Sequence, residues 1–286
     1  MNILLFFFIF SGNIFVMLVG WDGLGVVSFL LVIFYGRPYV LDAGLLTVFS
    51  NRVGDAFFLL FFGWFFASGG LSPDFLWGVG VVPLLFVFLG AVTKRAQLPF
   101  SSWLPAAMAA PTPVSSLVHS STLVTAGVYV LLRYNFSFVH SVFFYSVSLS
   151  TFFLAGVGAF FEMDFKKVVA MSTLSQLGFM IFCLSVGLWG VSFFHIVLHA
   201  VFKSMLFLSC GVLMVSLGGG QDSRFFGGSA SSLSFVGFFT RVIRLGGFPF
   251  SVGFYRKDTI ILGVCGAGFG WFSYVVFLLS CLLSVA

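Results

Sequence analysis

Long apolar runs that contain almost no charge constrain this chain more than any other feature. Its 13 Lys or Arg residues and 8 Asp or Glu residues make up only 7% of the 286 residues, whereas 60% are hydrophobic. An ordinary soluble domain is about one quarter charged, because a polar surface must cover its core. The composition therefore excludes a water-soluble globule and predicts a membrane protein.

The apolar runs have the length of membrane-spanning helices. A bilayer core about 30 Å thick needs about 20 apolar residues in a helix, and barrel strands are much shorter. We therefore predict an all-α, polytopic transmembrane helix bundle, treated as a single domain over 1–286 with approximate repeat halves 12–133 and 141–286. An apolar helix at 1–10 should precede spans at about 12–35, 43–67, 82–105, 113–133, 141–161, 167–187, 190–216, 229–263 and 265–286.

Two of the predicted spans carry a proline in a similar setting. The interruptions are Gln97–Ser101 and Gly247–Ser251, and a lysine, Lys94 or Lys257, lies near each. Paired, proline-interrupted spans in two halves are typical of inverted-repeat transporters with an ion site at each break. A proline also simply kinks many membrane helices, so the breaks alone leave both interpretations open.

Ionisable side chains inside the first spans require an explanation. A charge in the middle of the bilayer costs at least about 2.5–3.5 kcal/mol, so it needs a partner, water or a task. Asp22 lies between glycines near the middle of its span. Asn51 and Asp55 are four residues apart and share a helix face, and Arg52 can pair with Asp55. That pair could serve a local structural role or a functional one.

A second group of titratable residues follows one helix face. His195, His199 and Lys203 are spaced four residues apart, which places neighbours about 6 Å apart along the helix axis. The spacing favours a proton path, with a buried histidine pair or a metal site as alternatives. His119 lies in a hydroxyl-rich stretch and can both donate and accept a proton, although the hydroxyls could also only pack helices together.

Several other ligands are not indicated. The net charge of +5 comes from scattered basic residues, which argues against nucleic acid. The cysteines lie in apolar runs without Cys-x-x-Cys spacing, which argues against an iron–sulfur or zinc site. No phosphate-binding loop is present, so we expect no nucleotide, and without clustered cysteines or a ligand set for haem we expect no other cofactor in this chain.

A series of short motifs, in order along the chain, is similar to one family. The motifs are Gly20–Gly25, Asn51–Asp55, Lys94–Pro105, Ala110–Thr122, Asp164–Lys167, Ser172–Gly178, His195–Phe207 and Gly253–Asp258. On these motifs, essentially the whole chain resembles NADH dehydrogenase subunit 5, the family of large antiporter-like membrane subunits of respiratory complex I. The sister subunits 2 and 4 share the repeat and the lysines but match these motifs less closely.

The resemblance implies an antiporter-like inverted repeat with two discontinuous helices and a proton path through it. In the first half-channel, the acidic member would be Asp22, the basic member Lys94 and the neighbouring carboxylate Asp55. The path would continue through His119, His195, His199 and the central Lys203, and it would end at the exit-side Lys257.

The chain also departs from the family in places. Bacterial relatives carry Glu where this chain has the shorter Asp22, so a water could bridge Asp22 and Lys94. Arg241 and Arg244 fall in a stretch that relatives fill with apolar or hydroxyl residues, and the sequence does not explain them. The family's first spans, last spans and long lateral helix have no counterpart here, so we expect a part of a longer protein.

The function implied by the resemblance is that of a proton-translocating subunit of NADH:ubiquinone oxidoreductase. This chain would carry no redox centre, because NADH, FMN, iron–sulfur clusters and ubiquinone are expected in partner subunits. Its partners would be the other membrane subunits of complex I, especially the subunit 4-like neighbour, and the lipid of the mitochondrial inner membrane.

Three alternatives remain at this stage. The chain could belong to a multi-subunit cation/proton antiporter, which shares the lysines and the broken helices. It could be a non-transporting membrane scaffold whose polar residues only hold helices together. It could also be a membrane metalloenzyme that uses His195 and His199.

Overall fold

The regular structure of the described chain is helical throughout. The computed structural model describes residues 2–34, 36, 38–67, 81–133, 142–216, 218–225 and 232–266, together with 275, 278 and 279. Apart from one isolated bridge between Asp164 and Asp222, every regular element in these residues is a helix. The prediction of an all-α protein is confirmed.

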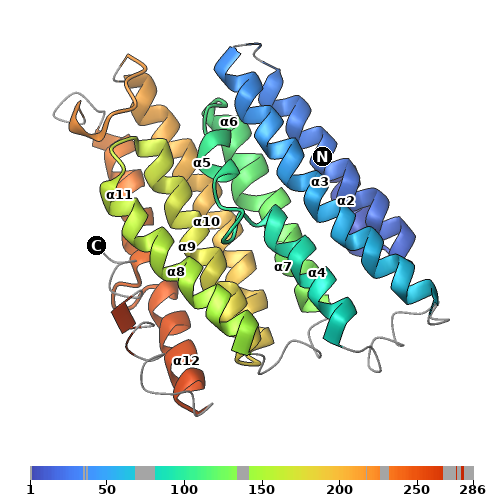
Figure 1. Cartoon of the computed structure of the whole chain (residues 1–286). Coiled ribbons are helices and arrows are strands. Elements are labelled where there is room, and N and C mark those ends of the chain that lie inside the picture. Colours follow the sequence, from blue (N-terminus) through green and yellow to red (C-terminus); the bar gives the residue numbers. More distant parts are fainter. Residues whose placement is uncertain are drawn as a thin grey trace. The chain divides into compact units, whose positions relative to one another are not determined.

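The chain divides into two compact units, Met1–Ala110 with Thr122–Phe138 and Pro111–Ser121 with Val139–Ala286. The helices of the first unit are α1 (Asn2–Phe10), α2 (Ile14–Ile33), α3 (Pro38–Ala67), α4 (Val81–Lys94), α5 (Trp103–Ala107) and α7 (Leu123–Arg133). The second unit contains α6 (Thr112–Ser115), most of the π-helix η2 (Ser116–Thr122), α8 (Val142–Phe161), α9 (Phe165–Ser185), α10 (Trp189–Ser216), the short 3-10 helix η4 (Ser223–Phe225), α11 (Ser232–Gly246) and α12 (Val252–Gly266) (Figure 1).

Six helical segments are long and apolar enough to cross a membrane, within the part of the chain that the structure describes. They are Phe15–Ile33, Pro38–Ala67, Thr112–Arg133, Phe143–Phe161, Phe165–Ser185 and Trp189–Ser216. The polytopic arrangement is therefore confirmed for these segments. The predicted span at 265–286 lies almost entirely outside the described residues.

Several helix boundaries differ from those predicted. The predicted span at 43–67 begins earlier, at Pro38, because proline favours the first position of a helix. In the span at 82–105, the predicted interruption is Gln97–Ser101, and α4 ends somewhat earlier, at Lys94, while α5 begins at Trp103. In the span at 229–263, α11 and α12 are separated by five residues at 247–251, which are the residues of the predicted interruption.

Glycines allow the helices of the first unit to approach closely. A Cβ at Gly20 on α2 would lie 2.9 Å from the Cβ of Phe8 on α1. Gly54 on α3 faces Thr93 on α4, and a Cβ at Gly90 on α4 would lie 2.6 Å from the ring of Phe58 on α3. These close contacts place α4 directly against α3, which brings the end of α4 to the polar centre of α3.

In the second unit, an apolar core joins helices that are distant in sequence. Leu149 and Phe152 on α8 pack against Phe179 and Phe182 on α9, and Ile260 on α12 joins the same cluster. Cys183 belongs to this core, and Cys210 on α10 is also fully buried. These two cysteines pack as small hydrophobic residues, whereas the side chains of Cys265 and Cys281 lie outside the described residues.

A glycine-to-alanine pair on α3 tests the close contact between α3 and α4. At Gly54, the added Cβ would meet Thr93 and the carbonyl oxygen of Gly90, so Gly54→Ala should destabilise the fold by about 1–3 kcal/mol. At Gly63 on the same helix, an added Cβ meets nothing within 4 Å, so Gly63→Ala should be neutral or stabilise slightly. Thermal unfolding midpoints of the two purified variants in detergent give the comparison, and equal midpoints would contradict this packing.

Candidate functional site

Asp55, in the middle of α3, is the centre of a charged cluster in the first unit. Its Oδ1 accepts a hydrogen bond of 2.9 Å from Nε1 of Trp21 and lies 3.6 Å from Nζ of Lys94. Its Oδ2 lies 3.4 Å from Nη1 of Arg52, one turn earlier on α3. The local pairing of Arg52 with Asp55 that the sequence predicts is present, and a longer-range ion pair to α4 is added to it.

Lys94 lies at the carboxyl end of α4, and its side chain is buried. Its side chain is 1% exposed, and Nζ donates a 2.6 Å hydrogen bond to the backbone oxygen of Trp21 on α2. Nζ also lies 3.9 Å from the centroid of the Trp21 ring, within cation–π distance. The carboxylate, the carbonyl oxygen and the aromatic ring together stabilise an ammonium group that is closed off from bulk solvent.

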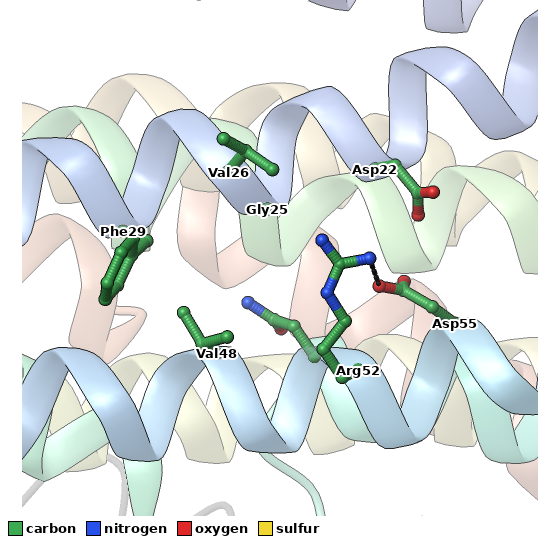
Figure 2. Close-up of a pocket in the computed structure, with 8 residues that line it drawn as sticks. Asp22, Gly25, Val26, Phe29, Val48, Arg52 and Asp55 are labelled. Carbon is green, nitrogen blue, oxygen red and sulfur yellow. Dashed lines mark hydrogen bonds and ion pairs between the residues drawn. The ribbon is translucent and has the colours of Figure 1, made fainter.

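A cavity of about 240 Å³ opens beside this cluster between α2 and α3. Its lining residues are Asp22, Gly25, Val26, Phe29, Val48, Asn51, Arg52 and Asp55. Figure 2 shows the carboxylate of Asp22 on α2 pointing toward Asp55 and the guanidinium group of Arg52 on α3. Asp22 thus contributes charge to the cavity, while the carboxylate that forms an ion pair with Lys94 is that of Asp55.

The second unit contains a line of titratable residues on α10. His195, His199 and Lys203 are 0%, 1% and 2% exposed, and the two imidazole rings have centroids 6.2 Å apart. Phe179 on α9 packs edge-on against His195, with centroids 5.3 Å apart. Nζ of Lys203 donates a 2.5 Å hydrogen bond to Oγ of Ser172 on α9. The predicted spacing therefore produces one buried polar face against α9.

The break between α11 and α12 has its own lysine. Nζ of Lys257 on α12 donates a 2.7 Å hydrogen bond to the backbone oxygen of Gly246, the last residue of α11. Gly247 follows with φ +82, a conformation that favours glycine. Lys257 therefore binds the carboxyl end of the helix before the break.

The predicted site residues fall into two groups. Asp22, Asp55 and Lys94 belong to the first unit, where Asp22 and Asp55 line the α2–α3 cavity and Lys94 lies 3.6 Å from Asp55. The second unit carries the remaining predicted residues: His119, His195, His199, Lys203 and Lys257. His119 lies in the π-helix η2, but its side chain is outside those that the structure describes.

Sequence reasoning missed two residues that contact the lysines. Trp21 bonds Asp55 through its indole and Lys94 through its carbonyl, and only its place beside Asp22 between glycines could have indicated this. Ser172 begins the Ser172–Gly178 motif, but its contact with Lys203 depends on how α9 packs against α10. Arg241 and Arg244 lie on α11, and nothing in the structure explains them.

A fully buried arginine was also not predicted as a feature of the site. Arg95 follows Lys94, and its Nη2 donates a 3.0 Å hydrogen bond to the backbone oxygen of Gly127 on α7. A Cβ at Gly127 would lie 2.9 Å from the Arg95 side chain, so this glycine makes room for the arginine. As for metals, the described residues include no group of three or more His, Cys, Asp or Glu that could hold an ion.

Residues 11–283 match the family model of the NADH:quinone oxidoreductase/Mrp antiporter transmembrane region. The chain is 46% identical over 290 residues to NADH-ubiquinone oxidoreductase chain 5 of Aedes aegypti, covering 97% of this chain and 50% of that one. The corresponding protein of Anopheles arabiensis is 46% identical over 264 residues, which is 88% of this chain and 69% of that one. The chain thus spans about half the length of the first of these relatives.

Solved structures show the same fold. A chain of the Mrp complex from Dietzia sp. superimposes with a TM-score of 0.87 at 26% identity, over 99% of this chain and 34% of that one. A chain of the archaeal membrane-bound sulfane sulfur reductase gives a TM-score of 0.86 at 23% identity, over 96% of this chain and 60% of that one. With the family match and the relatives, these findings show that the chain belongs to the NADH-ubiquinone oxidoreductase chain 5 family, within the NADH:quinone oxidoreductase/Mrp antiporter proteins.

Proposed function

We propose that this chain forms part of a proton-translocating, antiporter-like membrane subunit of an NADH:ubiquinone oxidoreductase, the respiratory complex I of the mitochondrial inner membrane. The observation that carries the proposal is Lys94, an ammonium group closed off from bulk solvent and 3.6 Å from the carboxylate of Asp55, which itself lines a cavity. Buried ionisable groups of this kind in membrane proteins mark ion paths and proton relays. The similarity to NADH-ubiquinone oxidoreductase chain 5 supports the same assignment.

The proposed mechanism makes Lys94 a switch that Asp55 controls. Two opposite charges about 4 Å apart interact by about 4 kcal/mol at an effective dielectric constant near 20. That interaction stabilises the charged lysine while Asp55 lies 3.6 Å away. When the carboxylate withdraws, the stabilisation is lost and Lys94 passes its proton on. Arg52, which lies on the other side of Asp55, provides an alternative partner for the withdrawn carboxylate.

In the second unit, the proposed proton carriers are the titratable side chains on α10. Lys203 passes a proton to the hydroxyl of Ser172, which accepts its hydrogen bond, as the O–H proton of that hydroxyl leaves to the next acceptor. His195 and His199 relay protons along the same helix face. His119 would connect to this group and Lys257 would release the proton, as the family resemblance implies. Each step moves one proton between neighbouring nitrogen or oxygen atoms and needs no redox centre in this chain.

We also propose that the two helix breaks belong to an antiporter-like inverted repeat. The break after α4 and the break after α11 each contain a proline, and a lysine beside each break binds a backbone carbonyl oxygen. The repeat halves would be 12–133 and 141–286 within a single transmembrane domain. Broken helices offer the two arrangements that a proton switch needs.

The proposed partners are the other membrane subunits of complex I, especially a subunit 4-like neighbour, and the bilayer lipid. NADH, FMN, iron–sulfur clusters and ubiquinone would be held by other subunits. The exposure of the Arg52 side chain supports the proposal of a neighbouring subunit, because this side chain is 57% exposed in the middle of an apolar helix. A guanidinium group at that depth needs water or a polar partner.

Replacing Lys94 by Met tests the switch. The variant keeps an unbranched side chain that is one heavy atom shorter, and it leaves Asp55 bonded to Trp21 and Arg52, so the subunit should still assemble. We expect proton translocation per NADH oxidised, measured in proteoliposomes, to fall by at least about threefold. The control Lys167→Met, at the partly exposed start of α9, should pump normally. Normal pumping by Lys94→Met would contradict the mechanism.

A pair of serine variants on α9 tests the second group. Ser172→Ala removes the oxygen that accepts from Lys203, whereas Ser175→Ala removes a buried hydroxyl that bonds only the backbone of its own helix in the described contacts. A hydrogen bond to a charged group is worth about 1.5–3 kcal/mol, so Ser172→Ala should slow proton-coupled turnover roughly tenfold. Equal turnover of the two variants would show that Ser172 has no part in proton transfer.

A cation/proton antiporter is the second candidate, since the likeness to a chain of the Mrp complex favours it. The two functions differ in their ion requirement. For the proposed function, we expect proton movement in vesicles to depend on NADH oxidation and to be unchanged when Na⁺ and K⁺ are replaced by choline. Proton movement that requires Na⁺ or K⁺ without NADH would favour the antiporter.

A further inference from the structure

A buried amide beside the charged cluster has polar atoms for which the described residues supply no hydrogen-bond partner. Asn51 on α3 is 4% exposed, and neither its Oδ1 nor its Nδ2 has a hydrogen-bond partner in the described part of the chain. Leaving such a group unsatisfied costs about 1–3 kcal/mol, and buried polar groups in native proteins nearly always have a partner. Asn51 therefore requires a partner beyond the described protein atoms.

The α2–α3 cavity offers space for that partner. Asn51 lines the cavity of about 240 Å³ together with the charged groups Asp22, Arg52 and Asp55. One water occupies about 30 Å³, so the space is large enough for several. The Asn51 amide offers both a donor and an acceptor, so a molecule that satisfies both of its polar atoms must itself bring an acceptor and a donor.

The amide of Asn51 also lies close to Lys94. A Cβ placed at Gly25 would be 4.0 Å from Nδ2 of Asn51 and 3.8 Å from Nζ of Lys94. Both polar groups therefore border the same small space, which the absent side chain of Gly25 leaves open.

We propose that Asn51 is a positioning residue that holds ordered water in the α2–α3 cavity and directs it toward Lys94. Its Nδ2 donates to a water oxygen and its Oδ1 accepts from a water O–H, so the bound waters take a fixed orientation. Water fits better than a further cation, because Arg52 and Lys94 both pair with Asp55, so the positive charges of this cluster already equal in number the negative charges of Asp22 and Asp55.

The role of this water in proton transfer rests on the proposed function. When Lys94 is neutral, its amine forms a new N–H bond to a proton from the nearest water, whose O–H bond breaks. That water takes a replacement proton from the next water toward the cavity mouth. One proton enters, one reaches Lys94, and each water is restored.

The water itself is tested in a way that does not depend on proton pumping. A high-resolution electron-microscopy map of the assembled complex should show at least one water hydrogen-bonded to the Asn51 amide in the cavity. In Asn51→Leu, a substitution that removes both polar atoms, that density should disappear. A wild-type cavity without density at hydrogen-bond distance from Asn51 would overturn the proposal.

The positioning role is tested by activity, with Thr47→Val on the same helix as the matched control. Thr47 is 3% exposed, and its hydroxyl donates a hydrogen bond to the backbone oxygen of Gly44. Thr47→Val therefore also removes a buried polar atom, but Thr47 is not among the residues that line the cavity. Asn51→Leu should lower proton translocation at least threefold and increase the solvent deuterium isotope effect on turnover. Asn51→Ser, which retains a donor and an acceptor, should recover most of that loss.

The outcomes separate this proposal from the proposed function. If Lys94→Met stops pumping while Asn51→Leu behaves as Thr47→Val does, the positioning role of Asn51 is wrong and the proposed function stands. If Lys94→Met pumps normally, the proposed function fails, and the map of the cavity alone decides whether Asn51 holds water.

Discussion

A charge enclosed by apolar helices is stable only where another group compensates it, and Asp55 provides that compensation in the first unit. One carboxylate accepts from Trp21 and forms ion pairs with both Arg52 and Lys94. The desolvation of an ion costs several kcal/mol even after the protein relaxes, so a buried carboxylate needs compensating partners, and Trp21 and Arg52 still supply them when Lys94 is replaced. The close packing of α3 and α4 and the placement of Lys94 at the end of α4 are consistent with this requirement.

The two units surround their lysines differently. Lys94 has a carboxylate, a backbone carbonyl and an aromatic ring around it, whereas the hydrogen bond of Lys203 goes to the neutral hydroxyl of Ser172. A charged partner that can move changes the energy of its lysine by several kcal/mol, while a hydroxyl can itself accept and donate a proton. The proposed division of work follows, with switching at Lys94 and relay at Lys203.

Sequence reasoning succeeded where a feature depends on local geometry. The helical class follows from apolar length, and the shared face of His195, His199 and Lys203 follows from the helical repeat. The Arg52–Asp55 pair follows from spacing in the same way. The earlier start of α3 at Pro38 was within reach as well, since a proline at the first helical position is a known signal.

Features that depend on contacts between helices could not be derived in this way. The ion pair of Lys94 with Asp55 joins residues from α4 and α3, and the family resemblance instead directed attention to Asp22. The Trp21 contacts and the Lys203–Ser172 hydrogen bond arise from the packing of separate helices, which no periodicity in one segment encodes. The cavity beside Asn51 is likewise a property of how α2 and α3 meet.

The central claim is that Asp55 and Lys94 act as one unit in proton transfer. A double-mutant cycle on the proton-to-electron stoichiometry, with Asp55→Asn, Lys94→Met and both together, tests that claim most directly, because groups that act as a unit are not additive. We predict that the double variant loses no more stoichiometry than the more impaired single variant. Losses that multiply in the double variant would show that the two residues act independently and would contradict the account.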